Sequence, residues 1–255
     1  MTLGFIVAAS VAGGTLSAGA AALALALRAS WVPMLVSFAI GTLLGAAFLE
    51  ILPHAFEHGE PHSVAAAILG GILAFFALEK LLLWRHCHAE DCEAHDRHAA
   101  PNDRGRAATL IVVGDTAHNF LDGVLIAAAF LQSTELGVVT ALAIVAHEIP
   151  QEVGDFLILL HSGWSKAKAL AANLASSFAT LAGGVIGYFA LPLFAGWEPA
   201  MLGFVAASMI YVAVADLIPG LHRRPELGAT FAQIALIAAG IGSVLVAGAL
   251  VGHSH

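Results

Sequence analysis

Two groups of ionisable and amide side chains stand in stretches of this sequence that are otherwise apolar. One group lies in GDTAHNFLDGVLIAAAF and the other in AIVAHEIPQEVGDFLILL, and their candidate metal ligands are His118, Asn119, Asp122, His147, Glu148, Gln151 and Glu152. A charged side chain at the centre of a bilayer costs at least about 2.5 to 3.5 kcal/mol. Several such residues within one or two helical turns therefore indicate a functional site.

Helical spacing decides which of these side chains can act together. On a helix, residues i and i+4 share a face, so His118 projects with Asp122, and His147 projects with Gln151. Imidazole, carboxylate and amide groups that face each other across two antiparallel helices form a nitrogen and oxygen cage suited to Zn²⁺ or a similar ion. Pro150 cannot donate to the carbonyl four residues earlier, so it is expected to kink the second helix beside the cage.

Further polar residues extend the two groups along their helices. Asn119 and Glu148 each follow a histidine and point toward an adjacent side, where they could line a second site or the next step of a path. Glu152 continues inward from the cage and is predicted to carry the ion onward. Asp115 and Asp155 either serve the same transit or pair with backbone groups and lysines near the inner surface. Both interpretations stay open.

The overall composition places these groups in a membrane. Apolar residues make up 59% of the chain and charged residues only 11%, and the mean hydropathy is +0.87. Windows of about 20 apolar residues are long enough to span a bilayer. We therefore predict an all-α integral membrane protein in which residues 1–255 form a single transmembrane domain. The eight predicted spans lie near residues 3–27, 31–57, 63–86, 107–131, 136–161, 166–191, 197–221 and 228–251.

The basic residues predict how this bundle lies in the membrane, because Lys and Arg are retained on the cytoplasmic side during insertion. With eight spans and both termini on the extracytoplasmic side, all ten Lys and Arg residues fall at cytoplasmic helix ends or loops. We therefore predict a multi-pass protein of the cell (inner) membrane. The net charge of −8 does not indicate a nucleic-acid partner, because five of the acids lie inside the two polar helices. The expected partners are the lipid bilayer and divalent metal ions.

The predicted cytoplasmic loop, at about residues 86–106, holds both cysteines of the chain, Cys87 and Cys92, together with four histidines. Thiols stay reduced in the cytoplasm, so no disulfide is implied. These thiols and imidazoles could capture a thiophilic divalent ion weakly and exchangeably. A polar linker with fortuitous histidines is the alternative.

A short internal similarity connects the second and seventh predicted spans. The segment FLEILPHAF contains Glu50 and Pro53, and VADLIPGLH contains Asp216 and Pro219. Because the two spans run in opposite directions, the two acid-x-x-Pro segments are predicted to lie at opposite membrane faces. Inverted repeats with Pro-broken helices allow alternating access in transporters. The pattern therefore favours a transporter.

The paired motifs HNFLDG and HEIPQEVGDF resemble the signature of the ZIP (ZRT/IRT-like) family of divalent metal transporters. The similarity continues through GTLLGAAFLEILPHAF, FFALEKLL, NLASS and YVAVADLIPGLH. The resemblance implies an inverted-repeat bundle of eight helices, extracytoplasmic termini, and uptake of Zn²⁺, or of Fe²⁺, Mn²⁺ or Cd²⁺, into the cytoplasm. It assigns a first metal site to His118, Asp122, His147 and Gln151, and a second to Asn119, Asp122, Glu148 and Gln151, with Asn173 close by.

One position departs from that signature, because many members have a histidine where this chain has Gln151, a neutral and weaker zinc ligand. The same position argues against an enzyme. An intramembrane metalloprotease needs the motif HExxH, and its second histidine is missing here. A metal-sensing or proton-conducting membrane protein could use the same histidines and carboxylates, so that class is the alternative. A homodimer is conceivable, although no feature of the sequence argues for it.

Overall fold

The computed structural model describes residues 1–23, 32–84, 101–194, 196, 198–222 and 226–252, and every regular element within them is helical. These elements are α1 (Thr2–Leu23), α2 (Val32–Gly45), η2 (Ala46–Ile51), α3 (Leu52–His58), α4 (Pro61–Trp84), α5 (Pro101–Gln132), α6 (Thr134–His161), α7 (Lys166–Ala190), η3 (Leu191–Phe194), α8 (Glu198–Tyr211), η4 (Val212–Leu217), α9 (Ile218–Leu221) and α10 (Leu227–Gly252). Eight described stretches are long and apolar enough to cross a membrane. The predicted all-α class and number of spans are confirmed.

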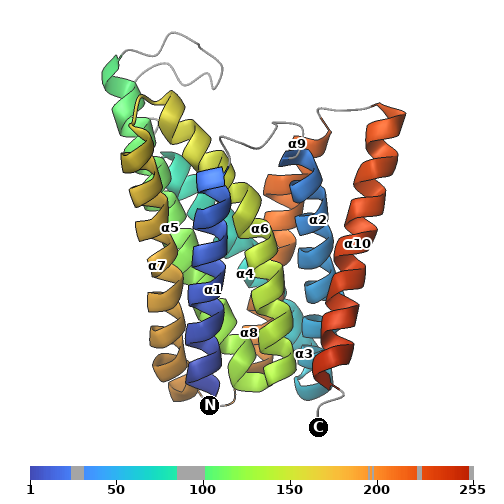
Figure 1. Ribbon diagram of the computed structural model, residues 1–255. Coiled ribbons are helices and arrows are strands. Elements are labelled where there is room, and N and C mark those ends of the chain that lie inside the picture. The colour runs from blue at the N-terminus through green and yellow to red at the C-terminus, as the bar shows by residue number, and fades with distance from the viewer. Residues whose placement is uncertain (24–31, 85–100, 195, 197, 223–225, 253–255) are drawn as a thin grey trace.

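The bundle has two distinct ends. Helix α1 begins and α10 ends at the same end, at the bottom of Figure 1, which we call the terminal end. Helix α5 begins at the other end, which we call the loop end, and its first residue is Pro101. The last six residues of the loop predicted at 86–106 are therefore helical. Proline suits the first helical position, because an N–H there would have no partner within the helix. Cys87 and Cys92, and with them the predicted metal capture, lie outside the described residues.

The second and seventh spans share a local distortion that matches their sequence similarity. Each contains a π-helical turn, η2 or η4, followed at once by a short α-helix with proline as its second residue, Pro53 in α3 and Pro219 in α9. At both turns a backbone N–H reaches the carbonyl five residues back, from Leu52 to Ala47 and from Ile218 to Ala213. A wider turn relieves the clash of the proline ring with the preceding turn.

These two distortions lie at opposite ends of the bundle. Helix α3 is near the terminal end and α9 is at the loop end (Figure 1). The two spans run antiparallel, as an inverted repeat requires. The Asp216 side chain, which belongs to the second copy of the motif, lies outside the described part.

The helices pack in two groups. One group joins α1, α5, α6 and α7, with η3 against α7, and the other joins α2, α4, α8 and α10 with η2, α3, η4 and α9. Helix α6 connects the groups, because it also packs against α2 and α10. The closest packing within the first group is between α5 and α7, because glycines meet where they cross. A Cβ on Gly123 would collide with the Thr180 carbonyl oxygen, and a Cβ on Gly183 would collide with the Phe120 carbonyl oxygen. Small residues of this kind let membrane helices approach closely, and here they hold α5 against α7.

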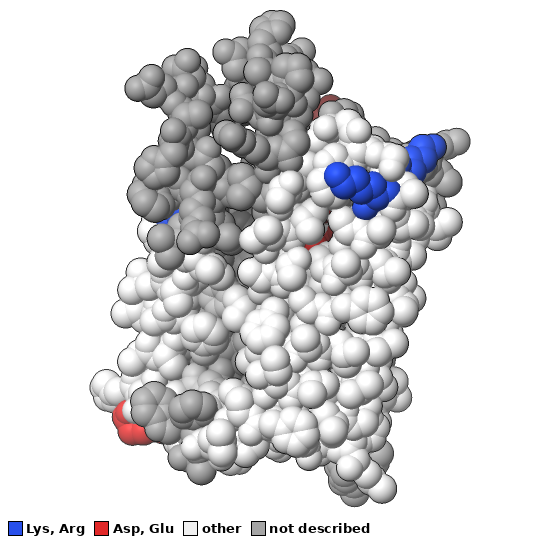
Figure 2. Space-filling view, turned by 90° about the vertical axis from the view of Figure 1, so that its left-hand side faces the viewer, with Lys and Arg blue, Asp and Glu red and all other residues white. Residues whose placement is uncertain are grey.

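Large apolar side chains cover much of the outer surface. Leu69 on α4, Phe178 on α7 and Phe231 on α10 are each at least 60% exposed. Figure 2 shows one such face, which is white over most of its middle apart from a small recessed red patch, and whose Lys and Arg atoms lie toward its upper, loop end. The described lysines Lys166 and Lys168 begin α7 at that end. An apolar belt with basic residues at one end is the surface expected of a membrane-spanning bundle.

Candidate metal site

Three of the predicted ligands come together between α5 and α6. His118 Nε2 lies 3.2 Å from His147 Nε2 and 3.5 Å from Asp122 Oδ2, and His147 Nε2 lies 3.2 Å from the same carboxylate oxygen. Among the described residues, His118, Asp122 and His147 are the group of potential ligands that is compact enough to hold a metal ion. His147 and Asp122 are each 2% exposed. The contacts join the faces that the i, i+4 spacing predicted.

The separations between these three atoms suit a tetrahedral ion. Two ligands that each lie about 2.0 to 2.1 Å from Zn²⁺ at the tetrahedral angle are about 3.3 Å apart. The observed separations of 3.2, 3.2 and 3.5 Å bracket that value. Two imidazoles and one carboxylate supply three ligands and leave a fourth position open, which suits an ion that enters and leaves.

The orientation of His147 is set by its own helix. Its Nδ1 lies 3.3 Å from the Ala143 carbonyl oxygen, one turn earlier in α6. A hydrogen bond from Nδ1 to a carbonyl keeps the proton on that nitrogen and leaves the Nε2 lone pair free for a cation. Helix α6 runs unbroken from Thr134 to His161 with Pro150 inside it. The two histidine-bearing helices are joined by a short turn, where Ser133 caps α6 by accepting from the Leu136 N–H.

The amide ligands predicted beside the histidines make other contacts in this conformation. Gln151 donates from Nε2 to Asp115 Oδ1 at 3.4 Å. Asn119 donates from Nδ2 to Asp115 Oδ1 at 3.2 Å and to Glu152 Oε1 at 3.5 Å. Asp115, a residue whose role the sequence left open, is thus the acceptor at the centre of a buried polar network on the loop side of the histidines.

Glu148 and Glu152 are both buried in α6. Glu148 is 3% exposed, and its Oε1 has no hydrogen-bond partner within the described part. Glu152 is 1% exposed and receives two contacts from α7, where Asn173 Nδ2 donates to its backbone oxygen at 2.9 Å and Ser177 Oγ donates to Oε1 at 3.2 Å. Asn173 therefore lies next to the site, as expected, but contacts the α6 backbone.

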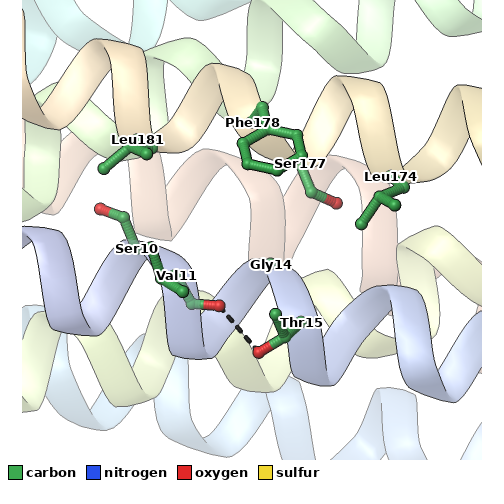
Figure 3. Close-up of a pocket in the computed structure, with 8 residues that line it drawn as sticks. All are labelled: Ser10, Val11, Gly14, Thr15, Leu174, Ser177, Phe178 and Leu181. Carbon is green, nitrogen blue, oxygen red and sulfur yellow. Dashed lines mark hydrogen bonds between the residues drawn. The ribbon is translucent and has the colours of Figure 1, made fainter.

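Sequence reasoning missed the role of Ser177, because an isolated serine in an apolar helix is typical of simple packing. Figure 3 shows Ser177 on the side of α7 that faces α1, with Gly14 below it. A Cβ on Gly14 would lie 3.1 Å from the Ser177 Cβ, so the glycine makes room for this serine. No spacing rule within one helix could have paired Ser177 with Glu152.

A cavity lies next to the site. This cavity, of about 430 Å³, is lined by His118, Asp115, Gln151 and Asp155 on one side and by Phe75 and Tyr211 of the other helix group on the opposite side. The lining residues other than His118 lie between the site and the loop end. Toward the terminal end, α5 continues through residues 125–130, which are all apolar and buried in the core. The cavity therefore lies on the loop side of the ligands, and the apolar core lies on their terminal side.

Fold and site together define a class of protein: a multi-pass helical membrane protein with a cluster of His and Asp side chains, able to hold a metal ion, between two of its spans. Comparison with known proteins agrees with that class. The family model described as ZIP Zinc transporter matches residues 2–248. The chain belongs to this family, so the predicted resemblance is confirmed.

Several curated relatives are similar over most of this chain. Zinc transporter zipt-7.2 of Caenorhabditis elegans is 32% identical over 82% of this chain and 56% of its own length. Zinc transporter YKE4 of Saccharomyces cerevisiae is 31% identical over 73% of this chain and 60% of its own length. Human zinc transporter ZIP13 is 32% identical over 81% of this chain and 68% of its own length. The chain therefore matches little more than half of the length of the first two.

Proposed function

We propose that this protein carries zinc ions across a membrane through the site formed by His118, Asp122 and His147. The observation that supports this most directly is the spacing of the three ligand atoms, 3.2 to 3.5 Å, around a buried position with one coordination place left open. The relatives named above are described as zinc transporters. A ligand set of two imidazoles and one carboxylate suits Zn²⁺, and it also accepts Fe²⁺, Mn²⁺ or Cd²⁺ as competing cargo.

The direction of transport in this proposal is into the cytosol across the cell membrane. Lys166 and Lys168 lie at the loop end, and basic residues favour the cytoplasmic side. The cavity beside the site lies on that same side of the histidines, as an exit path toward the cytosol would. The membrane potential favours entry of a divalent cation by about 4.6 kcal/mol per 100 mV, twice the value for one charge.

The other predicted ligands complete the proposed path. Gln151, four residues after His147, lies on the same face of α6 as this histidine. Glu148, one residue after His147, lies on an adjacent side of the helix. Asn119 follows His118, and Glu152 lies one position beyond Gln151 toward the loop end. Each carboxylate or amide oxygen would replace part of the hydration of the ion as it leaves the histidines. Asn173 acts in this proposal by fixing the α6 backbone at Glu152.

Zinc uptake into proteoliposomes tests the proposal. We expect saturable flux by the wild-type protein and loss of that flux in His147→Ala, while His62→Ala, whose side chain is 98% exposed on α4, transports normally. Competition by Fe²⁺, Mn²⁺ and Cd²⁺ ranks the possible cargoes. Absence of zinc flux in proteoliposomes that contain the folded wild-type protein would contradict the proposal. A proton current without zinc would favour the proton-conducting alternative.

A further inference from the structure

Two histidines lie on one face of the short helix α3, near the terminal end of the bundle (Figure 1). His54 and His58 are four residues apart, and their ring centroids are 4.2 Å apart with 27° between the ring planes. The His58 side chain is exposed and the His54 side chain is half-buried. Histidines at positions i and i+4 of a helix share a face and can bind one Zn²⁺ ion together.

The backbone of α3 fixes the tautomer of His58. Its Nδ1 lies 2.9 Å from the His54 carbonyl oxygen. Because a carbonyl oxygen only accepts hydrogen bonds, Nδ1 carries the proton and Nε2 keeps a free lone pair. His147 of the buried site has the same arrangement with the Ala143 carbonyl, one turn earlier in its own helix. His58 therefore presents a nitrogen atom that is ready to bind a cation at the surface.

The separation of the two rings is close to what a shared metal ion needs. Two nitrogen ligands of one Zn²⁺ ion are about 3.3 Å apart, since each lies about 2.0 to 2.1 Å from the metal. With the centroids 4.2 Å apart, a small tilt of the exposed His58 ring brings one nitrogen of each ring to that separation. Water completes the coordination shell at such an exposed position. Two imidazoles and water make a weak, exchangeable site for Zn²⁺, Ni²⁺ or Cu²⁺.

The charges at the terminal end favour a cation. The acids on α3, at the start of α4, and in the first turns of α6 and α8 all lie at this end, and they are Glu57, Glu60, Glu135 and Glu198. The described lysines lie toward the loop end, on α4 and α7. A surface region with one sign of charge raises the local concentration of the opposite ion. Divalent cations should therefore accumulate around α3.

Two further carboxylates lie beside α3 on the inner side. A Cβ on Gly248 of α10 would lie 2.7 Å from Glu50 Oε1 and 3.6 Å from Glu135 Oε1, so these two acids approach the same point of that helix. Within the described residues, neither acid forms an ion pair with a basic side chain. An ion held by the α3 histidines would thus have negative charge next to it, toward the interior of the bundle.

We propose that His54 and His58 form a shallow, exchangeable site for a divalent transition-metal ion such as Zn²⁺ at the terminal end. This site is separate from the one between α5 and α6. Glu135 begins α6 at the terminal end, and His147 lies twelve residues later, about 18 Å along the helix. As a place that captures zinc before transport, the α3 site rests on the proposed function. As a metal site, it is measured independently.

Modification of histidines by diethyl pyrocarbonate, read residue by residue by mass spectrometry, tests this site in the purified full chain titrated with Zn²⁺. We expect His58 to react without metal and to be protected by Zn²⁺, in His147→Ala as well as in the wild type. His54→Ala should raise the zinc concentration that half-protects His58 at least tenfold, since even changes outside the ligand shell cost roughly 10- to 100-fold. His62, an exposed histidine that contacts Glu60, is the internal control and should stay reactive at these concentrations.

Two results would overturn the paired site: protection of His58 no stronger than that of His62, or protection unchanged by His54→Ala. Loss of the protection in His147→Ala would trace it to metal in the buried site and would overturn the α3 site as well. For the capture role, His58→Ala should raise the zinc concentration that gives half-maximal flux, and an unchanged concentration would refute that role. Absence of zinc flux while His58 is still protected would contradict the proposed function and leave the α3 site standing.

Discussion

Replacing Ser177 with alanine removes a hydroxyl that holds Glu152 between α6 and α7. The hydroxyl lies 3.2 Å from Glu152 Oε1 and 2.9 Å from the Asn173 carbonyl oxygen of its own helix, and both Ser177 and Glu152 are at most 4% exposed. Without it, that oxygen keeps only the Asn119 amide at 3.5 Å. Depriving a buried polar group of its partner costs about 1 to 3 kcal/mol. For a chain of this length the expected fall in Tm is therefore about 2 to 12 °C.

Thermal unfolding of the metal-free protein in detergent measures this effect. Ser243→Ala is the matched control, because its hydroxyl bonds only the Gly240 carbonyl, at 2.7 Å within α10. A change away from any buried network is expected to stay within about 0.5 kcal/mol. If the Tm of Ser177→Ala falls no further than that of Ser243→Ala, the hydroxyl does not support Glu152, and the reasoning about the network is refuted.

Three further predictions concern binding, packing and topology. Zinc at a hundred times its Kd should stabilise the wild type by about 2.7 kcal/mol. In the same thermal assay, Asp122→Asn should lose most of this zinc-dependent stabilisation. Equal stabilisation of both proteins by zinc would exclude Asp122 as a ligand. Gly123→Ala should prevent recovery of monodisperse protein by size-exclusion chromatography because its Cβ collides with the α7 backbone, whereas Gly154→Ala, with no atom within 4 Å of its Cβ, should be tolerated. Ser63 on α4 and Ala167 on α7 are exposed and lie at opposite ends of the bundle. In a cysteine-free background, an impermeant maleimide should therefore label Ser63→Cys in intact cells and Ala167→Cys only after permeabilisation. The reverse pattern would overturn the proposed orientation.

Much of the fold could be predicted from the sequence because a bilayer imposes simple rules. Apolar length indicates a span, and the eight spans found agree with those expected. The repeated acid-x-x-Pro segments also correspond to a repeated local structure, because Pro53 and Pro219 each follow a π-helical turn. The start of α5 was harder to predict, because the polar segment after Pro101 looks like a loop when only hydropathy is considered.

The site was predictable only in part. His118 and Asp122 share a helix face by spacing alone, and His147 meets them because a short turn joins the two helices. Gln151 has the right spacing to join them, yet its amide faces Asp115. An i, i+4 rule specifies a face, but the rotamer of a long side chain depends on which acceptor lies nearest in space.

The sequence by itself determined the chemistry and the setting: histidines, acids and amides at helical spacing, inside segments that only a membrane can accommodate. The tertiary structure decided which of them meet. Gly123 and Gly183 let α5 and α7 approach until backbone contacts backbone, and this brings Ser177 and Asn173 onto Glu152. Spacing along one helix carries no information about the distance to another, so contacts between α5, α6 and α7, and the cavity beside them, follow only from how the helices pack.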